Sequence, residues 1–229
     1  LTALEIADLE IPWSASIVDG FRLVSGGTIV ASRMALRGGV VVHLGGGFHH
    51  AFAGHGEGFC LFNDVAVALR VLRREGEVEI AAVLDCDVHQ GNGTARIFEE
   101  DPAVFTCSMH QQNNYPLNKP PSSLDIALAD GVGDSEYLAH LQVALAAVSA
   151  ADPDLLVYLA GADPYEDDQL GGLALTQSGL RERDRQVFQF ASSLGVPVVV
   201  VLAGGYARRF NDTVSIHTAT VEEAVATDA

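Results

Sequence analysis

The sequence predicts an α/β protein built on a doubly wound parallel sheet, and two observations lead to this prediction. Short apolar runs rich in Val, Ile and Leu recur along the chain, and they have the composition of buried parallel strands. Helix-like stretches separate most of these runs, and such alternation is typical of three layers with helices on both faces of the sheet. With 229 residues, 48% of them hydrophobic, the chain is long enough to bury a sizeable core.

Five runs are expected to form strands, at 39–44, 80–84, 103–107, 155–160 and 196–203. Helices are expected at 18–37 with a break at 25–27, at 63–74 behind an Asn-Asp start, at 135–149, at 178–194 with Gly195 as the stop, and at 211–226. Residues 111–133 carry three prolines and many turn formers without a helical period, so they are expected to form a long loop. No repeat or linker divides the chain, which predicts a single catalytic domain over residues 1–229.

The charge and composition of the chain exclude several classes of protein. The formal net charge of -17 at pH 7, from 30 acidic and 13 basic residues, would repel phosphate backbones, so direct nucleic-acid binding is not expected. The apolar runs are too short to cross a bilayer and no basic leader opens the chain, so a soluble cytoplasmic protein is expected, or a nuclear one in a eukaryote. Cys60, Cys86 and Cys107 form no CxxC pair and are interpreted as small buried residues.

Polar residues gather where each predicted strand ends. The five clusters are GGGFHH at 45–50, DCDVHQGNG at 85–93, SMH at 108–110, GAD at 161–163 and AGGY at 203–206. In open α/β sheets, ligands bind at the edge formed by the carboxyl ends of the strands. We therefore expect the five clusters to form one site.

Three residues of these clusters suit a metal ion. Asp87 and His89 are separated by one residue, which in an extended segment points both side chains the same way. Together with Asp163 they give two carboxylates and one imidazole, a set compatible with zinc or ferrous iron that leaves positions open for water and substrate. Singly, Asp87 and His89 also fit a hydrogen-bonded pair at a strand end and Asp163 a helix cap, but together the three favour a metal site.

Four further residues are interpreted as groups that act on a substrate. His49 and His50 follow three glycines and suit a general base and acid, since imidazole has a fitting pKa, although a surface turn would also explain them. Asp85 could accept the NH of one imidazole and orient it. Tyr206 follows two glycines, so its hydroxyl could enter a cleft and donate to an oxyanion, or its ring could simply cover the sheet edge.

The blocks GGGFHHAFAGHGEGFCLFNDVAVA, LDCDVHQGNGT, AGAD and LAGGY, in this order, resemble the signature blocks of the histone deacetylase superfamily. The resemblance implies the arginase/deacetylase fold, with a parallel sheet of about eight strands flanked by helices. It implies a catalytic zinc on Asp87, His89 and Asp163, tandem histidines at His49 and His50, and Asp85 behind the first of them. Tyr206 would polarise the substrate carbonyl.

The resemblance also implies a substrate tunnel and a second cation. Gly58 and Phe59 match tunnel positions, and Leu170 would sit at the rim of the tunnel. A structural potassium ion is implied near Asp85, Asp87, His89, Ser108 and Met109, mainly on backbone oxygens.

The sequence departs from the family pattern in two respects. Where many class I members read HHGDG, this chain has HQGNG, so that Asn92 replaces a charged partner of His50; together with GGT at 26–28 and GGLALTQSG at 171–179 this indicates the class IV type or its bacterial relatives. The first strands of the family and an early loop have no counterpart, so we expect a deacetylase-like domain that is incomplete at its N-terminus.

The function expected from these residues is hydrolysis of an acyl-amine amide bond, in acyl-lysine or a similar substrate, by a water that zinc activates. An acylpolyamine or a small metabolite is the alternative substrate. A ureohydrolase of the arginase type would need a two-manganese cluster, typically with a DAHxD block and a late DxD, whereas DCDVHQGNG and GADPYEDD favour one metal. A silent module that binds acylated partners is the remaining alternative, and the filled catalytic positions argue against it.

Overall fold

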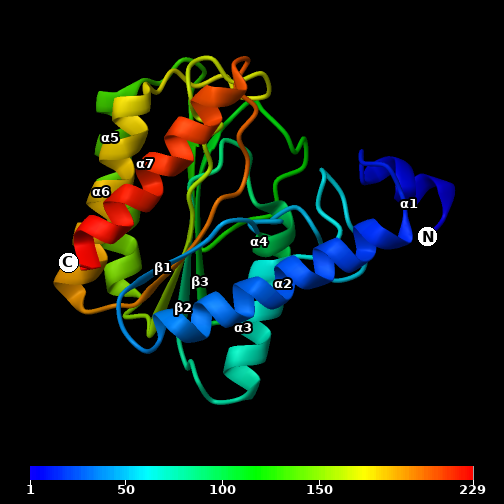
Figure 1. Ribbon diagram of the computed structural model, residues 1–229, viewed down its shortest axis with the longest axis horizontal. Helices are drawn as coiled ribbons and strands as arrows, with labels where there is room; N and C mark the ends of the chain where they lie inside the picture. The colour runs from blue at the N-terminus through cyan, green and yellow to red at the C-terminus, as the bar shows by residue number, and fades with distance from the viewer. Residues whose placement is uncertain (229) are drawn as a thin grey trace.

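The computed structural model describes residues 1–228, in which six parallel strands form one sheet between two layers of helices (Figure 1). The strands lie in the order β1-β6-β5-β2-β3-β4. Their bounds are β1 (Val40–His43), β2 (Ala81–Asp85), β3 (Val104–Gln111), β4 (Leu124–Leu128), β5 (Leu155–Leu159) and β6 (Val198–Val201). The predicted three-layer, doubly wound parallel sheet is confirmed, although the described residues hold fewer strands than the eight or so that the resemblance implies.

The direction of winding reverses in the middle of the sheet. From β2 the chain proceeds outward to β3 and β4, and it then returns to the other side of β2 as β5 and β6. Parallel register pairs Asp85 of β2 with Leu159 of β5 on one side and with Ser108 of β3 on the other. The carboxyl ends of β2 and β5 therefore flank the switch point of the fold, where α/β sheets bind ligands.

Alternate residues of the central strands supply two hydrophobic cores, one on each face. Leu84, Tyr158 and Val200 pack under the helices α5 (Asp134–Ala150), α6 (Gln177–Leu194) and α7 (Phe210–Asp228). On the other face, Val83 and Val157 pack under α2 (Ala15–Ala35) and α3 (Asp64–Arg74). Figure 1 shows these two groups of helices on opposite sides of the sheet. The central strands β2, β5 and β6 are buried on both faces, which explains their continuous apolar sequences.

Local signals in the sequence place several helix ends. The side chain of Asn63 caps α3 by accepting from Ala66 N at 2.9 Å, as the Asn-Asp start predicted. Gly195 ends α6 in the left-handed conformation, with φ of 69°. Two short helices, α1 (Ala3–Asp8) and α4 (Asn92–Phe98), were not predicted, because neither has enough turns to show an apolar period.

Two predictions about elements are wrong. Helix α2 has no break at 25–27, since Ser25 and Thr28 lie inside it and donate their hydroxyls to the carbonyls of Phe21 and Val24. The segment 111–133 is not wholly a loop, because Leu124–Leu128 forms β4 at the edge of the sheet beside β3. Its sequence LDIAL alternates apolar and other residues as a half-buried edge strand does, a signal that the nearby prolines concealed.

Two predictions from composition can be compared with the structure. Cys60, Cys86 and Cys107 are free and buried, as expected for small packing residues. Within residues 1–228, none of the helices combines the length and apolar character needed to cross a bilayer.

Candidate metal centre and catalytic site

A cavity of about 250 Å³ opens at the edge of the sheet where the carboxyl ends of the strands lie. Four of the five polar clusters reach it. The lining residues are Glu10, Gly46, Gly47, Phe48, His49, His50, Gly58, Phe59, Cys60, Asp87, His89, Asn114, Tyr115, Asp163, Leu170, Ala203, Gly204 and Tyr206. The expectation of one site is wrong for the cluster at 108–110, because β3 continues to Gln111 and keeps these residues in the sheet, where Ser108 Oγ and His110 Nδ1 pair with each other at 3.0 Å.

The turn after β1 carries the two histidines, and a buried carboxylate holds that turn in place. Asp64, the first residue of α3, accepts hydrogen bonds from Gly47 N at 3.0 Å and Phe48 N at 2.8 Å. Gly47 adopts a φ of 88°, which a side chain would disfavour, and an added Cβ would meet Ala203 at 2.8 Å. The glycines after β1 therefore let the chain turn tightly against the end of β6 and present His49 and His50 to the cavity.

Asp87, His89 and Asp163 form the predicted metal triad, with one ligand atom from each lying within 4.8 Å of the others. Asp87 and His89 follow β2, and Asp163 follows β5 across the switch point. His89 Nδ1 lies 3.0 Å from Asp87 Oδ1 and 3.4 Å from Asp163 Oδ2. The other oxygen of each carboxylate is held by the backbone. Asp87 Oδ2 accepts a hydrogen bond from Gly204 N at 2.8 Å, and Asp163 Oδ1 accepts one from Val88 N at 2.9 Å.

The surroundings of Asp163 fit a divalent cation. Its Oδ2 is buried and has no hydrogen-bond partner, which is costly for a charged oxygen. Burial and the charge of Asp87 raise the pKa of Asp163 to about 7, and they outweigh the opposite effect of His89, whose Nδ1 lies 3.4 Å from Asp163 Oδ2. No described helix starts at Asp163, so the helix-cap interpretation fails. Gly204 has no room for a Cβ, which would lie 2.2 Å from Asp163 Oδ2. The backbone beside the metal triad therefore needs glycine at this position.

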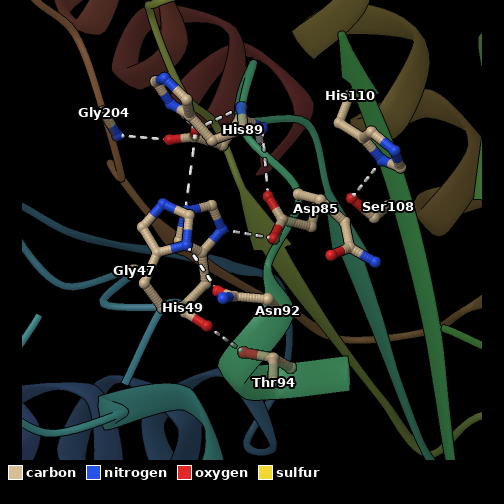
Figure 2. A network of polar contacts seen from close by, with 12 residues as sticks. Gly47, His49, Asp85, His89, Asn92, Thr94, Ser108, His110 and Gly204 are labelled. Carbon is tan, nitrogen blue, oxygen red and sulfur yellow. Dashed lines mark hydrogen bonds and ion pairs between the residues drawn. The ribbon is translucent and has the colours of Figure 1, made fainter. Parts of the chain in front are cut away.

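The two histidines have partners of different charge, and Figure 2 shows His49 beside Asp85. His49 Nδ1 donates to Asp85 Oδ2 at 2.6 Å, whereas His50 Nδ1 pairs with the amide oxygen of Asn92 at 2.8 Å. Their Nε2 atoms face each other at 3.1 Å, and both rings are buried. Burial alone would lower the pKa of His49, but the charges of Asp85 and Asp87 raise it to about 9. Burial and the neighbouring His49 hold the pKa of His50 well below its usual value.

The residues predicted for the tunnel lie in the wall of the cavity. Gly58, Phe59 and Leu170 line it, and the Phe59 ring lies 6.0 Å from that of Tyr206 between centroids. Backbone contacts anchor Tyr206, whose N–H donates to Asp168 Oδ2 at 2.6 Å and whose carbonyl accepts from Gln169 Nε2 at 2.9 Å. The tyrosine predicted to polarise a carbonyl is thus on the cavity wall.

Four lining residues were not among the predicted site residues: Glu10, Cys60, Asn114 and Tyr115. Glu10 is brought to the cavity by the preceding residues, since Asp8 and Leu9 accept backbone hydrogen bonds from Gly58 and Phe59 at 3.1 Å and 3.0 Å. Asn114 and Tyr115 come from the segment interpreted as a loop. An aromatic residue within a polar loop is a signal of binding that could have identified Tyr115, whereas nothing in the sequence near Glu10 indicates its position.

The residues matched to a potassium ion are adjacent at the ends of β2 and β3. Asp85 lies opposite Ser108 in the parallel register, and Met109 is fully buried beside it. Asp85 Oδ1 accepts from Asp87 N at 3.1 Å. The ion stays a prediction.

The switch point of this α/β sheet thus carries two carboxylates and one imidazole that could hold a metal ion, beside a buried pair of histidines. Residues 2–221 match the histone deacetylase domain model, and the chain therefore belongs to the histone deacetylase family. It is 44% identical over 211 residues to an uncharacterized protein of Picosynechococcus sp., covering 90% of this chain and 69% of that protein. It is 34% identical to histone deacetylase 2 of Arabidopsis thaliana, covering 81% of this chain and 49% of the plant protein.

Two solved structures share the fold. The HD domain of HDA15 superposes with a TM-score of 0.74 at 30% identity, covering 90% of this chain and 63% of that one. Acetylpolyamine aminohydrolase from Burkholderia pseudomallei superposes with a TM-score of 0.76 at 24% identity, covering 89% of this chain and 62% of that one, a likeness that speaks for the fold alone.

Proposed function

We propose that this chain hydrolyses an acyl-amine amide bond, in acyl-lysine or a related amine, with a single divalent metal ion held by Asp87, His89 and Asp163. The observation that carries the proposal is the buried Asp163 Oδ2, which accepts no hydrogen bond, in a triad that shares its cavity with two buried imidazoles. The donor set favours zinc, with ferrous iron as the alternative. A structural potassium ion near Asp85, Asp87, His89, Ser108 and Met109 belongs to the same proposal.

When bound, the metal ion would supply a Lewis acid that polarises the amide carbonyl and acidifies water. His50, held neutral by its surroundings, takes the proton from the attacking water and passes it to the leaving amine. His49 is kept protonated by Asp85, so it places a positive charge beside the reacting centre. Tyr206 donates its hydroxyl to the carbonyl oxygen as negative charge develops there. Gly58, Phe59 and Leu170 enclose the acyl-amine chain of the substrate.

The alternatives differ in metal content and turnover. A ureohydrolase would need two metal ions, but among residues 1–228 Asp87, His89 and Asp163 are the one group of three or more candidate ligands. A silent acyl-binding module would have no use for a neutral His50 that can accept a proton or for a tyrosine hydroxyl at the wall. An acylpolyamine remains a substrate alternative to acyl-lysine, because the same cavity accepts either chain.

The test combines metal content with turnover in one pair of variants. Asp163→Asn preserves the oxygen that accepts from Val88 N and replaces Oδ2, the oxygen without a hydrogen bond, by an amide nitrogen, which cannot bind a metal. We expect metal affinity to fall by on the order of a hundredfold or more, because losing even an outer partner of a ligand costs tenfold or more. Mass spectrometry gives the metal per chain, and an acetyl-lysine peptide and an acetylpolyamine give the turnover.

Asp19→Asn is the matched control, because Asp19 lies on the exposed face of α2. This variant should bind one metal ion per chain and turn over substrate like wild type. Wild-type protein that hydrolyses neither substrate when loaded with zinc would contradict the proposed function. Full metal content in Asp163→Asn would contradict the ligand assignment.

A further inference from the structure

A carboxylate lies directly behind the amide that contacts His50. Asn92 Oδ1 pairs with His50 Nδ1 at 2.8 Å, and Asn92 Nδ2 donates to Glu57 Oε1 at 2.6 Å. Tyr115 donates its hydroxyl to the same Glu57 oxygen at 2.8 Å. Hydrogen bonds thus connect the His50 imidazole through Asn92 to the Glu57 carboxylate, although position 92 itself is Asn where many class I members have Asp.

Glu57 is held by the turn that forms the cavity wall. Cys60 N donates to Glu57 O at 2.9 Å, and the two residues between them, Gly58 and Phe59, have φ of 52° and 67°. The outer oxygen of Glu57 faces His55 Nε2 at 3.5 Å, and 23% of the Glu57 side chain is exposed. The inner oxygen is therefore aimed at Asn92 by the same backbone that positions Phe59.

The hydrogen-bond donors and acceptors that link His50, Asn92 and Glu57 can be arranged in one way only. A carboxylate accepts hydrogen bonds and does not donate them, so the NH2 group of Asn92 must face Glu57 and its oxygen must face His50. His50 Nδ1 then carries the proton, and Nε2 is left with a lone pair. The Nε2 atom of His49 lies 3.1 Å from this atom.

We propose that Glu57 is a positioning residue that fixes the amide orientation of Asn92 and, through it, the tautomer of His50. This inference rests on the proposed function, in which His50 Nε2 takes a proton from water. Without Glu57 the two ends of the Asn92 amide are nearly the same size, and a flipped amide donates to His50 Nδ1. The proton of the imidazole then moves to Nε2, and the ring has no lone pair for water. The wrong tautomer of a catalytic histidine lowers turnover by on the order of 10⁴-fold in a protease triad.

A reciprocal exchange of the two side chains tests the proposal. In Glu57→Gln the neighbour of Asn92 can either accept or donate, so the amide is no longer fixed, and kcat should fall by on the order of tenfold or more. In Asn92→Asp two carboxylate oxygens replace a 2.6 Å hydrogen bond, and their repulsion should lower kcat to a similar degree. In the double variant the new amide at position 57 donates to the new carboxylate at position 92, and His50 Nδ1 keeps its acceptor. The kcat of the double variant should therefore return to within roughly threefold of wild type.

If Glu57 and Asn92 had independent structural roles, the opposite result would be expected, because the losses of kcat in the two single variants would multiply in the double variant. A double variant as impaired as that product would overturn the proposal. His55→Gln is the matched control, since it removes the partner of the outer Glu57 oxygen and leaves the inner oxygen untouched. It should keep the turnover of wild type, and a loss as large as that of Glu57→Gln would also count against the proposal.

A measurement of the tautomer separates this proposal from the proposed function. In protein labelled with ¹⁵N-histidine, the ring shifts of His50 should report a proton on Nδ1 in the wild type, with or without zinc, and a proton on Nε2 in part of the Glu57→Gln molecules. A wild-type ring with its proton on Nε2, or an unchanged ring in Glu57→Gln, would overturn the proposal. Wild-type protein without turnover but with the expected tautomers would instead sink the proposed function alone.

Discussion

Burial fixes the charge of a single histidine outside the metal triad, and this has a consequence for stability. His110 is 2% exposed near the end of β3, and burial lowers its pKa to about 4. In the unfolded chain a histidine has a pKa of about 6.5, so between these values the unfolded state binds a proton that the folded state does not. Stability is therefore lost as the pH falls from about 6.5 toward 4.

The prediction for His110 is that it contributes about 2 kcal/mol to the loss of unfolding free energy between pH 7 and pH 5. Urea unfolding of wild type and His110→Gln at both pH values measures the contribution. The variant loses the bond to Ser108 and should be less stable at pH 7, but its stability should change less with pH. Equal pH dependence in the two proteins would contradict the prediction.

At the residue scale, sequence predicts contacts between near neighbours better than contacts across the fold. The spacing of Asp87 and His89 is enough to place both side chains on one side of an extended segment. In the structure, His89 Nδ1 lies 3.0 Å from Asp87 Oδ1. The contact of Asn92 with Glu57 joins residues 35 positions apart through a turn with unusual φ values. No spacing rule reaches that contact, because it depends on how α4 packs against the turn.

At the scale of elements, helix α2 contains two adjacent glycines with different environments. An added Cβ at Gly27 would lie 2.6 Å from His43 Nε2, whereas at Gly26 it would meet nothing within 4 Å. His43 is itself held by Thr28, whose Oγ1 lies 3.1 Å from Nδ1. Gly27 thus allows the helix to approach β1 closely, while Gly26 has only the helix-destabilising effect of any glycine.

These environments predict opposite effects of the same substitution. Gly26→Ala should raise the free energy of unfolding by up to about 1 kcal/mol, because alanine is the better helix former. Gly27→Ala should lower it by about 1 to 3 kcal/mol, because the new methyl group must displace the His43 ring. Chemical denaturation of the two single variants gives both values. A stabilising effect of Gly27→Ala would show that α2 can move away from β1 without loss.

The elements that sequence missed were those with weak periodicity. The central strands β2, β5 and β6 were predicted because burial on both faces makes them continuously apolar, and the half-buried edge strand β1 also has an apolar run. Strand β3 was predicted from the apolar run at its start. Strand β4 is buried at alternate residues only, and the prolines before it favoured a loop. In α2 the glycines suggested a break, because steric need for a small residue and a helix end look alike in sequence.

At the scale of the whole molecule, the position of the site could be predicted because it follows from topology. Parallel strands bring their carboxyl ends to one edge, so clusters distant in sequence meet there, and four of the five did. Part of the cavity wall could not be predicted in the same way. Glu10 reaches it from the N-terminal segment and Tyr115 from the segment before β4, through contacts that depend on the folded surface.

The net charge of -17 at pH 7, with Glu10 at the cavity, predicts electrostatic attraction of cationic substrates. Long-range attraction raises the rate of encounter and is screened once the Debye length falls to about 10 Å near 0.1 M salt. For an acetylpolyamine with two free ammonium groups, kcat/KM should therefore fall by on the order of tenfold between about 10 mM and about 300 mM sodium chloride.

An uncharged acyl-amine substrate serves as the matched control in the same salt series. It experiences no attraction, so its kcat/KM should change by less than about twofold, which also shows that salt has not altered the metal centre. Glu10→Gln should reduce the salt dependence for the cationic substrate only in part, since the other acidic residues still contribute to the field. Equal salt dependence for the two substrates would mean that encounter is not steered by charge.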